Sequence, residues 1–229
     1  MKFGVVTFPG SNCDHDMIYT LETIMGHEIV HLWHKDGSIP KVDAIALPGG
    51  FTYGDYLRCG AIAKHSPIMA EVIKFANQNR PVFGICNGFQ ILCESGLLPG
   101  VLLQNTNQRF ICSNQYIVAD NPKTAFTAHA GSKPLNIPIA HSEGHYYAPD
   151  EMLEELEDNG QVLFRYCDKN GKITDEANPN GSVNHIAGVC NKNKNVYGMM
   201  PHPERAADHE LGNTDGLFIL ESFIKWISN

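Results

Sequence analysis

Three short apolar runs that end in glycine or proline constrain the fold of this chain most. Residues 3–8 are closed by Pro9-Gly10, residues 42–47 by a Pro-Gly-Gly turn, and residues 81–85 by a turn that contains Gly88. Runs of this length and composition are typical of buried strands. Helical patterns separate them, because residues 14–25 and 67–78 carry apolar side chains at helical spacing. Strands that alternate with helices predict a parallel sheet covered on both faces.

The second half of the chain has a different pattern. After Gly96, short strand-like runs follow one another with few helices between them, and the composition of residues 119–136 favours a surface loop. The chain length fits one domain over residues 1–229. We therefore predict a single-domain α/β fold with an open, mixed, mostly parallel sheet flanked by helices. The further elements expected are strands at 28–33, 101–119, 137–147, 161–167, 183–190 and 195–200, and helices at 89–95 and 215–228.

Composition argues against several classes of partner. The formal net charge is −8, whereas nucleic acids and anionic membranes bind basic surfaces. No stretch approaches the roughly 20 apolar residues that span a bilayer. The seven cysteines form no C-x-x-C pair and are odd in number, which disfavours a metal site and a disulfide framework. We expect no nucleic acid, membrane or metal partner, and a cytoplasmic protein with reduced thiols.

Cys86 lies between the run 81–85 and a helical pattern, in the sequence Gly-Ile-Cys-Asn-Gly. This is the pattern of the G-x-S-x-G nucleophile elbow, with sulfur in place of oxygen. Such a turn strains the backbone and needs small neighbours, here Gly84 and Gly88. It also places the sulfur at a helix N-terminus, where the dipole favours a thiolate. The alternative is an inert buried cysteine. Cys13, which also follows a strand, lacks the tight flanking glycines.

A cysteine nucleophile needs a base and a group that orients the base. In Pro-His202-Pro-Glu204 the imidazole and the carboxylate are two residues apart, and in an extended chain such residues point to the same side. The two prolines disfavour a helix here. The alternative is a solvated histidine in a proline-rich turn, and His141 and His145 are weaker candidates for the base. Together with Cys86, the His202–Glu204 pair favours a catalytic triad.

Attack on an amide creates an oxyanion that backbone N–H groups can stabilise. Gly50, in the Pro-Gly-Gly-Phe segment after residues 42–47, can present one such group at the sheet edge. The amide of Asn87, next to the nucleophile, is the second candidate. An ordinary glycine turn would have the same sequence, so this segment alone is a weak signal.

These segments together resemble the class I (triad) glutamine amidotransferases, which have a flavodoxin-like fold. That family carries a Pro-Gly-Gly strand end, a Gly-x-Cys-x-Gly-x-Gln elbow and a late His-x-Glu, and this chain has all three in that order. Essentially the whole chain is similar to the glutaminase subunits of phosphoribosylformylglycinamidine synthase. Ser142 and Thr106 depart from the usual glycine and serine, and both changes are mild. The segments that carry the narrower resemblance are residues 8–14, 49–58, 139–144 and 198–205.

The resemblance implies how glutamine is hydrolysed. Cys86 attacks the side-chain carbonyl and forms a thioester, His202 transfers protons, and Glu204 orients His202. The amides of Gly50 and Asn87 stabilise the oxyanion. The residues implied to contact the substrate are Gln90, Gly49, Phe51, Asn105, Thr106 and Asn107.

An ATP site is not apparent in the sequence, which has neither a G-x-x-x-x-G-K-[ST] loop nor a G-x-G-x-x-G fingerprint. The resemblance therefore implies no cofactor in this chain, and ATP and Mg on a separate synthetase subunit that receives the ammonia. A small accessory subunit is expected in the same complex, and glutamine hydrolysis is expected to be slow without these partners.

Two alternatives remain open. One is a glutaminase of another pathway, or a γ-glutamyl hydrolase of the same fold. The other is a non-catalytic binding module that keeps the fold. The complete set of Cys86, His202 and Glu204 argues against the second alternative.

Overall fold

The computed structural model describes residues 1–121, 124–131 and 133–228. Parallel strands form its N-terminal part. They belong to a compact unit of Met1–Leu98 and Asn195–Gly198. The strands are β1 (Lys2–Thr7), β2 (Glu28–Trp33), β3 (Ala44–Leu47), β4 (Val82–Ile85) and β11 (Val196–Met199). Their order is β2-β1-β3-β4-β11, and the pairs β1/β2, β1/β3 and β3/β4 are parallel.

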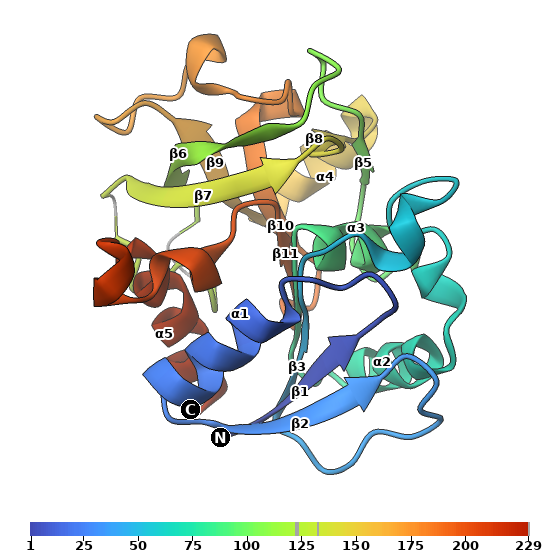
Figure 1. Ribbon diagram of the computed structural model, residues 1–229. Helices are drawn as coiled ribbons and strands as arrows, with labels where there is room; N and C mark the ends of the chain where they lie inside the picture. The colour runs from blue at the N-terminus through green and yellow to red at the C-terminus, as the bar shows by residue number, and fades with distance from the viewer. Residues whose placement is uncertain (122–123, 132, 229) are drawn as a thin grey trace. The chain divides into compact units, whose positions relative to one another are not determined.

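Helices cover these strands on both sides. They are α1 (Asp14–Tyr19), which continues as a π-helical turn over Thr20–Ile24, α2 (Pro67–Asn77) and α3 (Asn87–Glu94). Figure 1 shows α1 on one side of β1 and β3, and α2 on the other. Every residue of β3 and β4 is buried, as expected for strands covered on two faces. The predicted βαβ arrangement of this part is confirmed.

The second compact unit contains Pro99–Lys194 and Met199–Asn229. Four of its strands lie in the order β10-β9-β6-β7, and the pairs β10/β9, β6/β9 and β6/β7 are antiparallel. Two short strands, β5 and β8, pair antiparallel in a separate sheet. The strands are β5 (Val101–Leu103), β6 (Ile111–Ala119), β7 (Leu135–His141), β8 (His145–Tyr147), β9 (Val162–Cys167) and β10 (Ile186–Cys190).

The predicted strands of this unit needed correction at several bounds. The stretch 101–119 is two strands, β5 and β6, and 137–147 is β7 and β8 with a turn between them. In the stretch 183–190, residues Val183–His185 form a 3-10 turn before β10. Helix α4 (Asp150–Asp158) was not predicted. Only Leu153 and Leu156 of α4 are buried, so its apolar stripe is too thin to stand out among acidic residues.

The prediction of a surface loop over residues 119–136 was wrong for its central part, although no helix or strand lies between β6 and β7 in the described residues. Residues 124–127 are buried, and the Phe126 ring stacks on Phe223 with a centroid separation of 4.9 Å. Phe223 belongs to α5 (Asp215–Ile227), and the His129 N–H donates to Ser222 Oγ on the same helix at 2.8 Å. The segment therefore packs against α5; residues 122, 123 and 132 lie outside the described part.

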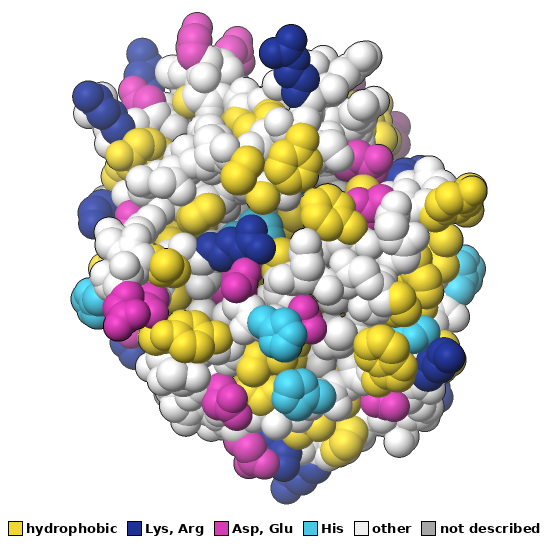
Figure 2. All heavy atoms as spheres, viewed as in Figure 1, with side chains coloured by type: hydrophobic (Ala, Val, Ile, Leu, Met, Phe, Trp, Pro, Cys, Tyr) yellow, Lys and Arg dark blue, Asp and Glu magenta, His cyan; other side chains and the backbone are white. Residues whose placement is uncertain are grey.

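The predicted α/β fold class, with a mixed, mostly parallel sheet flanked by helices, is confirmed, while the one-domain assignment of residues 1–229 stays a prediction. All seven cysteines are free thiols. Among the described residues, no helix has the length and apolarity needed to cross a bilayer. On the face seen in Figure 2, basic side chains are scattered among acidic, histidine and apolar ones.

Candidate active site

Cys86 occupies the turn between β4 and α3 in the first unit. Its backbone has φ 51° and ψ −106°, a region that non-glycine residues rarely adopt, and its side chain is buried. A Cβ on Gly88 would overlap the carbonyl oxygen of Leu47 on β3, and a Cβ on Gly84 would lie 2.5 Å from the Gly88 carbonyl carbon. The two glycines therefore let the turn approach the sheet, as the elbow pattern predicts.

Other cysteines lack this setting. Cys13, the rival candidate, has an ordinary φ of −105°, and its thiol donates to Asn12 Oδ1 at 3.3 Å. Burial raises the pKa of Cys167 to about 11 and that of Cys190 to about 12. For Cys93, burial and then the neighbouring Glu94 raise the thiol pKa well above its usual range. Because the thiolate is the nucleophilic form, the latter three are poor nucleophiles.

Gly50 lies where the predicted oxyanion segment leaves β3. It has φ 147°, forms an isolated bridge with Ser11, and leaves no room for a side chain, since a Cβ would lie 2.9 Å from Asn12 N. In this bridge the N–H of Phe51, not that of Gly50, donates to Gly10 O at 3.0 Å. The Phe51 N–H is therefore already engaged, while the role of Gly50 as oxyanion donor stays a prediction.

The side chain of Asn87 links the nucleophile turn to its surroundings, a role that sequence reasoning missed. Asn87 is fully buried, and its Oδ1 accepts from the Thr52 N–H at 3.2 Å. Its Nδ2 donates to Gln90 Oε1 at 2.8 Å and to Asp55 Oδ1 at 3.5 Å. One amide thus connects the turn after Gly50 with the predicted substrate residue Gln90. As the first residue of α3, Asn87 also carries a backbone N–H without a partner inside the helix.

The turn Thr52–Asp55 is held from its other side by Tyr53, which sequence reasoning also missed. The Tyr53 hydroxyl lies 2.6 Å from His34 Nδ1 and 2.8 Å from Ser66 Oγ. The pKa of His34 is lowered, first by burial and then by the charge of Lys35, while Asp36 acts in the opposite direction. No motif connects residues so far apart in the sequence, so only the fold reveals this anchor.

The predicted base and its orienting carboxylate lie together in the second unit. His202 Nδ1 and Glu204 Oε1 are 2.6 Å apart, and both side chains are buried. An ionised carboxylate can only accept, so the hydrogen lies on Nδ1 and the lone pair on Nε2. The predicted contact between the two side chains is confirmed, but the predicted extended backbone is wrong, because Pro203–Ala206 form a 3-10 turn. Pro203 begins this turn, where its missing N–H costs nothing.

Two contacts hold this turn in place. The His202 N–H donates to Pro138 O on β7 at 2.8 Å. On the other side, Gly216 of α5 lies so close that a Cβ there would overlap Pro203 O and approach Ala206 O to 2.7 Å. The base is thus fixed between the edge of β7 and the first turn of α5.

His141 ends β7 and is buried beside the base. Burial and then His202 lower the pKa of His141 to about 4, so this imidazole is neutral near pH 7. His141 Nδ1 lies 3.2 Å from Asn105 Oδ1, which also accepts from the Gly144 N–H at 2.9 Å. A neutral imidazole of this kind is a poor competitor for the base role. Burial also lowers the pKa of His145, the other lesser candidate, while a bond to the Gln104 backbone opposes it.

The predicted substrate segment 105–107 has mixed outcomes. Asn105 is buried, and its Nδ2 donates to Arg109 O and His141 O, so its side chain is structural. The Thr106 N–H donates to Asn180 O at 3.2 Å, while Thr106 and Asn107 are exposed. Contacts of these residues with glutamine, and those of Gly49, Phe51 and Gln90, stay predictions.

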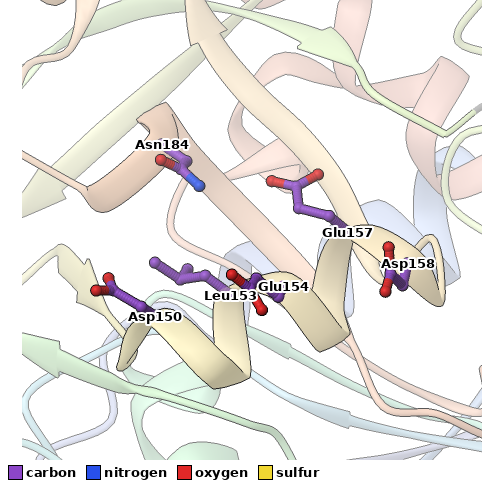
Figure 3. A pocket seen from close by; sticks show the side chains of 6 residues that line it. All are labelled: Asp150, Leu153, Glu154, Glu157, Asp158 and Asn184. Carbon is purple, nitrogen blue, oxygen red and sulfur yellow. The ribbon is translucent and has the colours of Figure 1, made fainter.

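A separate recess of about 530 Å³ follows α4. Asp150, Glu154, Glu157 and Asp158 lie along it, with Leu153 and Asn184 (Figure 3). Its carboxylates do not form a metal site, since no group of three or more histidine, cysteine or acidic residues in the described ranges is arranged to bind a metal ion. Glu157 instead pairs with Arg165 at 2.7 Å. None of the residues that line the recess is a cysteine, serine or threonine, so it contains no candidate nucleophile.

The strained turn that joins β4 to α3 at Cys86 is typical of α/β enzymes that carry a nucleophile. Residues 1–215 match the family of CobB/CobQ-like glutamine amidotransferase domains, and the chain belongs to that family. Within it, the chain is 55% identical to phosphoribosylformylglycinamidine synthase subunit PurQ of Chlorobaculum parvum, over 97% of this chain and 88% of the relative. It is 53% identical to the subunit of the same name from Chlorobium chlorochromatii, over 97% and 95%.

A solved structure extends the similarity to the fold. The chain matches a structure of PurLQS from Thermotoga maritima with a TM-score of 0.86 and 40% identity. The match covers 99% of this chain and 98% of the other. The similarity is therefore to whole chains, not to one shared segment.

Proposed function

We propose that this chain is the glutaminase subunit of phosphoribosylformylglycinamidine synthase in de novo purine biosynthesis. The observation that carries the proposal is the near full-length identity of 55% to a relative with that subunit name. The strained, buried turn at Cys86 supports the chemistry, because it is the geometry that a nucleophile elbow requires.

In the proposed reaction, Cys86 and His202 act together when glutamine is bound. Nε2 of His202 takes the thiol proton, and the sulfur attacks the side-chain amide carbon. The N–H groups of Gly50 and Asn87 stabilise the oxyanion. Its collapse breaks the C–N bond, and His202 returns the proton to the departing ammonia, leaving a thioester on Cys86.

Water completes the cycle. His202 removes a proton from the water that attacks the thioester carbon, and then returns it to the sulfur as the C–S bond breaks. The products are glutamate and the free thiol. Glu204 holds the Nδ1–H of His202 throughout and stabilises the imidazolium.

The proposal includes partners outside this chain. An ATP-dependent synthetase subunit, with ATP and Mg, receives the ammonia, and a small accessory subunit joins the complex. The Thermotoga maritima relative, described as PurLQS, supports a multisubunit assembly. In this proposal the chain itself needs no cofactor. We place it in the cytoplasm, the compartment of purine synthesis, where thiols stay reduced.

The test is ammonia release from glutamine by the chain alone and with the synthetase subunits, ATP and formylglycinamide ribonucleotide. We expect a slow rate alone and a clear rise with all components, and no activity for Cys86→Ala. If the rate of ammonia release is the same with and without the synthetase and the ribonucleotide, the result would instead favour a glutaminase of another pathway or a γ-glutamyl hydrolase. Turnover by Cys86→Ala at the wild-type rate would overturn the thioester mechanism.

A further inference from the structure

The hydrogen-bond network of Asn105 fixes the tautomer of His141. Asn105 Nδ2 donates to two carbonyl oxygens, of Arg109 at 2.9 Å and of His141 at 3.0 Å. The amide orientation is therefore set, and Oδ1 faces His141 Nδ1 as an acceptor. His141 Nδ1 must carry the hydrogen. In the neutral ring, Nε2 is then a bare acceptor.

His141 Nε2 has no hydrogen-bond partner among the residues that the structure describes, although it is buried. The whole side chain is only 3% exposed. Buried polar atoms are almost always paired, so an acceptor kept in this state indicates a ligand that donates to it. The backbone of Gly144 packs closely against the His141 ring, since a side chain at this position would collide with the ring.

The ring lies beside the proposed base. The two imidazoles are close enough to interact electrostatically, and the His202 N–H binds Pro138 O on the same strand that ends at His141. Ammonia leaves from, and water enters at, the position that faces His202 Nε2, since both exchange a proton with that atom. Each has more N–H or O–H groups than His202 alone can accept.

We propose that His141 Nε2 is the second acceptor for this small neutral hydrogen-bond donor, ammonia as it leaves and water as it enters. The inference rests on the proposed role of His202, but not on the purine pathway. His141 orients the ligand and takes no proton from it. Because the imidazole is neutral and a much weaker base than ammonia, it leaves ammonia unprotonated for transfer to the synthetase.

A matched pair of variants separates this role from a structural one. His141→Asn keeps a donor near the Nδ1 position for Asn105 Oδ1 but has no group at the Nε2 position. His141→Gln keeps an acceptor near Nε2 and gives up the bond to Asn105. His27→Phe, a change at a histidine of the first unit remote in sequence from the site motifs, is the control. All are made in the full chain and assayed alone and with the synthetase subunits.

We expect His141→Asn to lower kcat for glutamine hydrolysis by about 10- to 100-fold, the effect of losing one buried hydrogen bond in the reaction. His141→Gln should keep more activity than His141→Asn while its thermal midpoint falls further. Two rates identify the ligand: the first release of ammonia, and the decay of the Cys86 thioester followed by mass spectrometry. His141→Asn should slow both.

The reverse order would overturn the inference: His141→Asn active and His141→Gln inactive points to a purely structural histidine. Unchanged rates of both steps in a folded His141→Asn would also overturn it. Wild-type activity tests the proposed function separately, because it depends on Cys86 and His202 whatever the order of the two His141 variants.

Discussion

The two regions that carry the candidate catalytic residues, one in each unit, are built in different ways. The turn at Cys86 in the first unit is shaped by backbone contacts, with Gly84 and Gly88 pressed against neighbouring main chain. The base segment of the second unit is held by hydrogen bonds between buried polar side chains, among them His202–Glu204 and His141–Asn105. The nucleophile turn should therefore be sensitive to added atoms, and the base segment to lost charges and donors.

Gly88→Ala should have the largest effect. Its Cβ would overlap Leu47 O. The backbone fixes the position of the Cβ, and Leu47 O is a main-chain atom, so neither can rotate away. We expect a loss of about 4 kcal/mol or more in the free energy of unfolding, a large part of the roughly 5–15 kcal/mol of an ordinary domain. Urea unfolding measures this. The matched control is Gly37→Ala, where a Cβ has open space, and its change should stay within about 1 kcal/mol. Equal stabilities would refute the steric account of the turn.

Glu204→Gln tests the opposite sensitivity in the base segment. Gln has the shape of Glu but no charge, so His202 loses the partner that fixes its tautomer and stabilises its protonated form. We expect kcat for glutamine hydrolysis to fall by about 100- to 1,000-fold, or ~3–4 kcal/mol in the barrier. The thermal midpoint should move less than that of Gly88→Ala. A variant with full activity would show that the carboxylate charge is dispensable.

The same contrast explains what the sequence predicts well. The turn at Cys86 depends on small residues next to one another, so a local motif contains nearly all of it. Helix α4 escaped prediction because its buried side is little more than Leu153 and Leu156 within an acidic run. The buried segment 124–127 escaped because it lies in a stretch rich in Asn, Pro, Lys and Thr, and because Phe126 packs on Phe223, almost a hundred positions away.

Side-chain networks are the other part that pattern reasoning cannot reach. The sequence marks His141 only as a lesser candidate for the base. That its Nε2 is an acceptor follows from the bond of Nδ1 to Asn105, which is 36 residues away in the sequence. The pair His202–Glu204 was predicted from an extended backbone that the chain does not adopt, and the 3-10 turn brings the two side chains together instead. Local spacing thus identified two side chains that do pair, but from the wrong backbone geometry.

Acid should weaken the second unit through His141. Its pKa is lowered from 6.5 to about 4 in the folded chain, so between these values the unfolded state binds more protons. Stability is therefore fully present above pH 6.5 and falls as the pH approaches 4. Between pH 7 and pH 4.5, wild type should lose about 2–3 kcal/mol more than His141→Asn, which cannot titrate. Urea unfolding at both pH values measures the difference, and parallel losses would contradict the pKa assignment.

Asn87 breaks the comparison, because its side chain forms a buried polar network next to the sterically shaped turn at Cys86. Asn87→Ala removes the acceptor of the Thr52 N–H and the donor to Gln90 Oε1, while the backbone N–H at position 87 remains. We expect kcat/KM for glutamine to fall about tenfold, or ~1.4 kcal/mol, the smallest effect of this series. Asn87→Asp keeps the acceptor for Thr52 but sets a negative charge against Gln90 Oε1 and Asp55. If the bond to Thr52 positions Gly50, the Asn87→Asp variant should retain a higher kcat than Asn87→Ala. Its KM for glutamine should be raised, because the contact with Gln90 is disturbed. If both variants keep the wild-type kcat and KM, the Asn87 side chain only packs, and the turn at Cys86 depends on steric contacts alone.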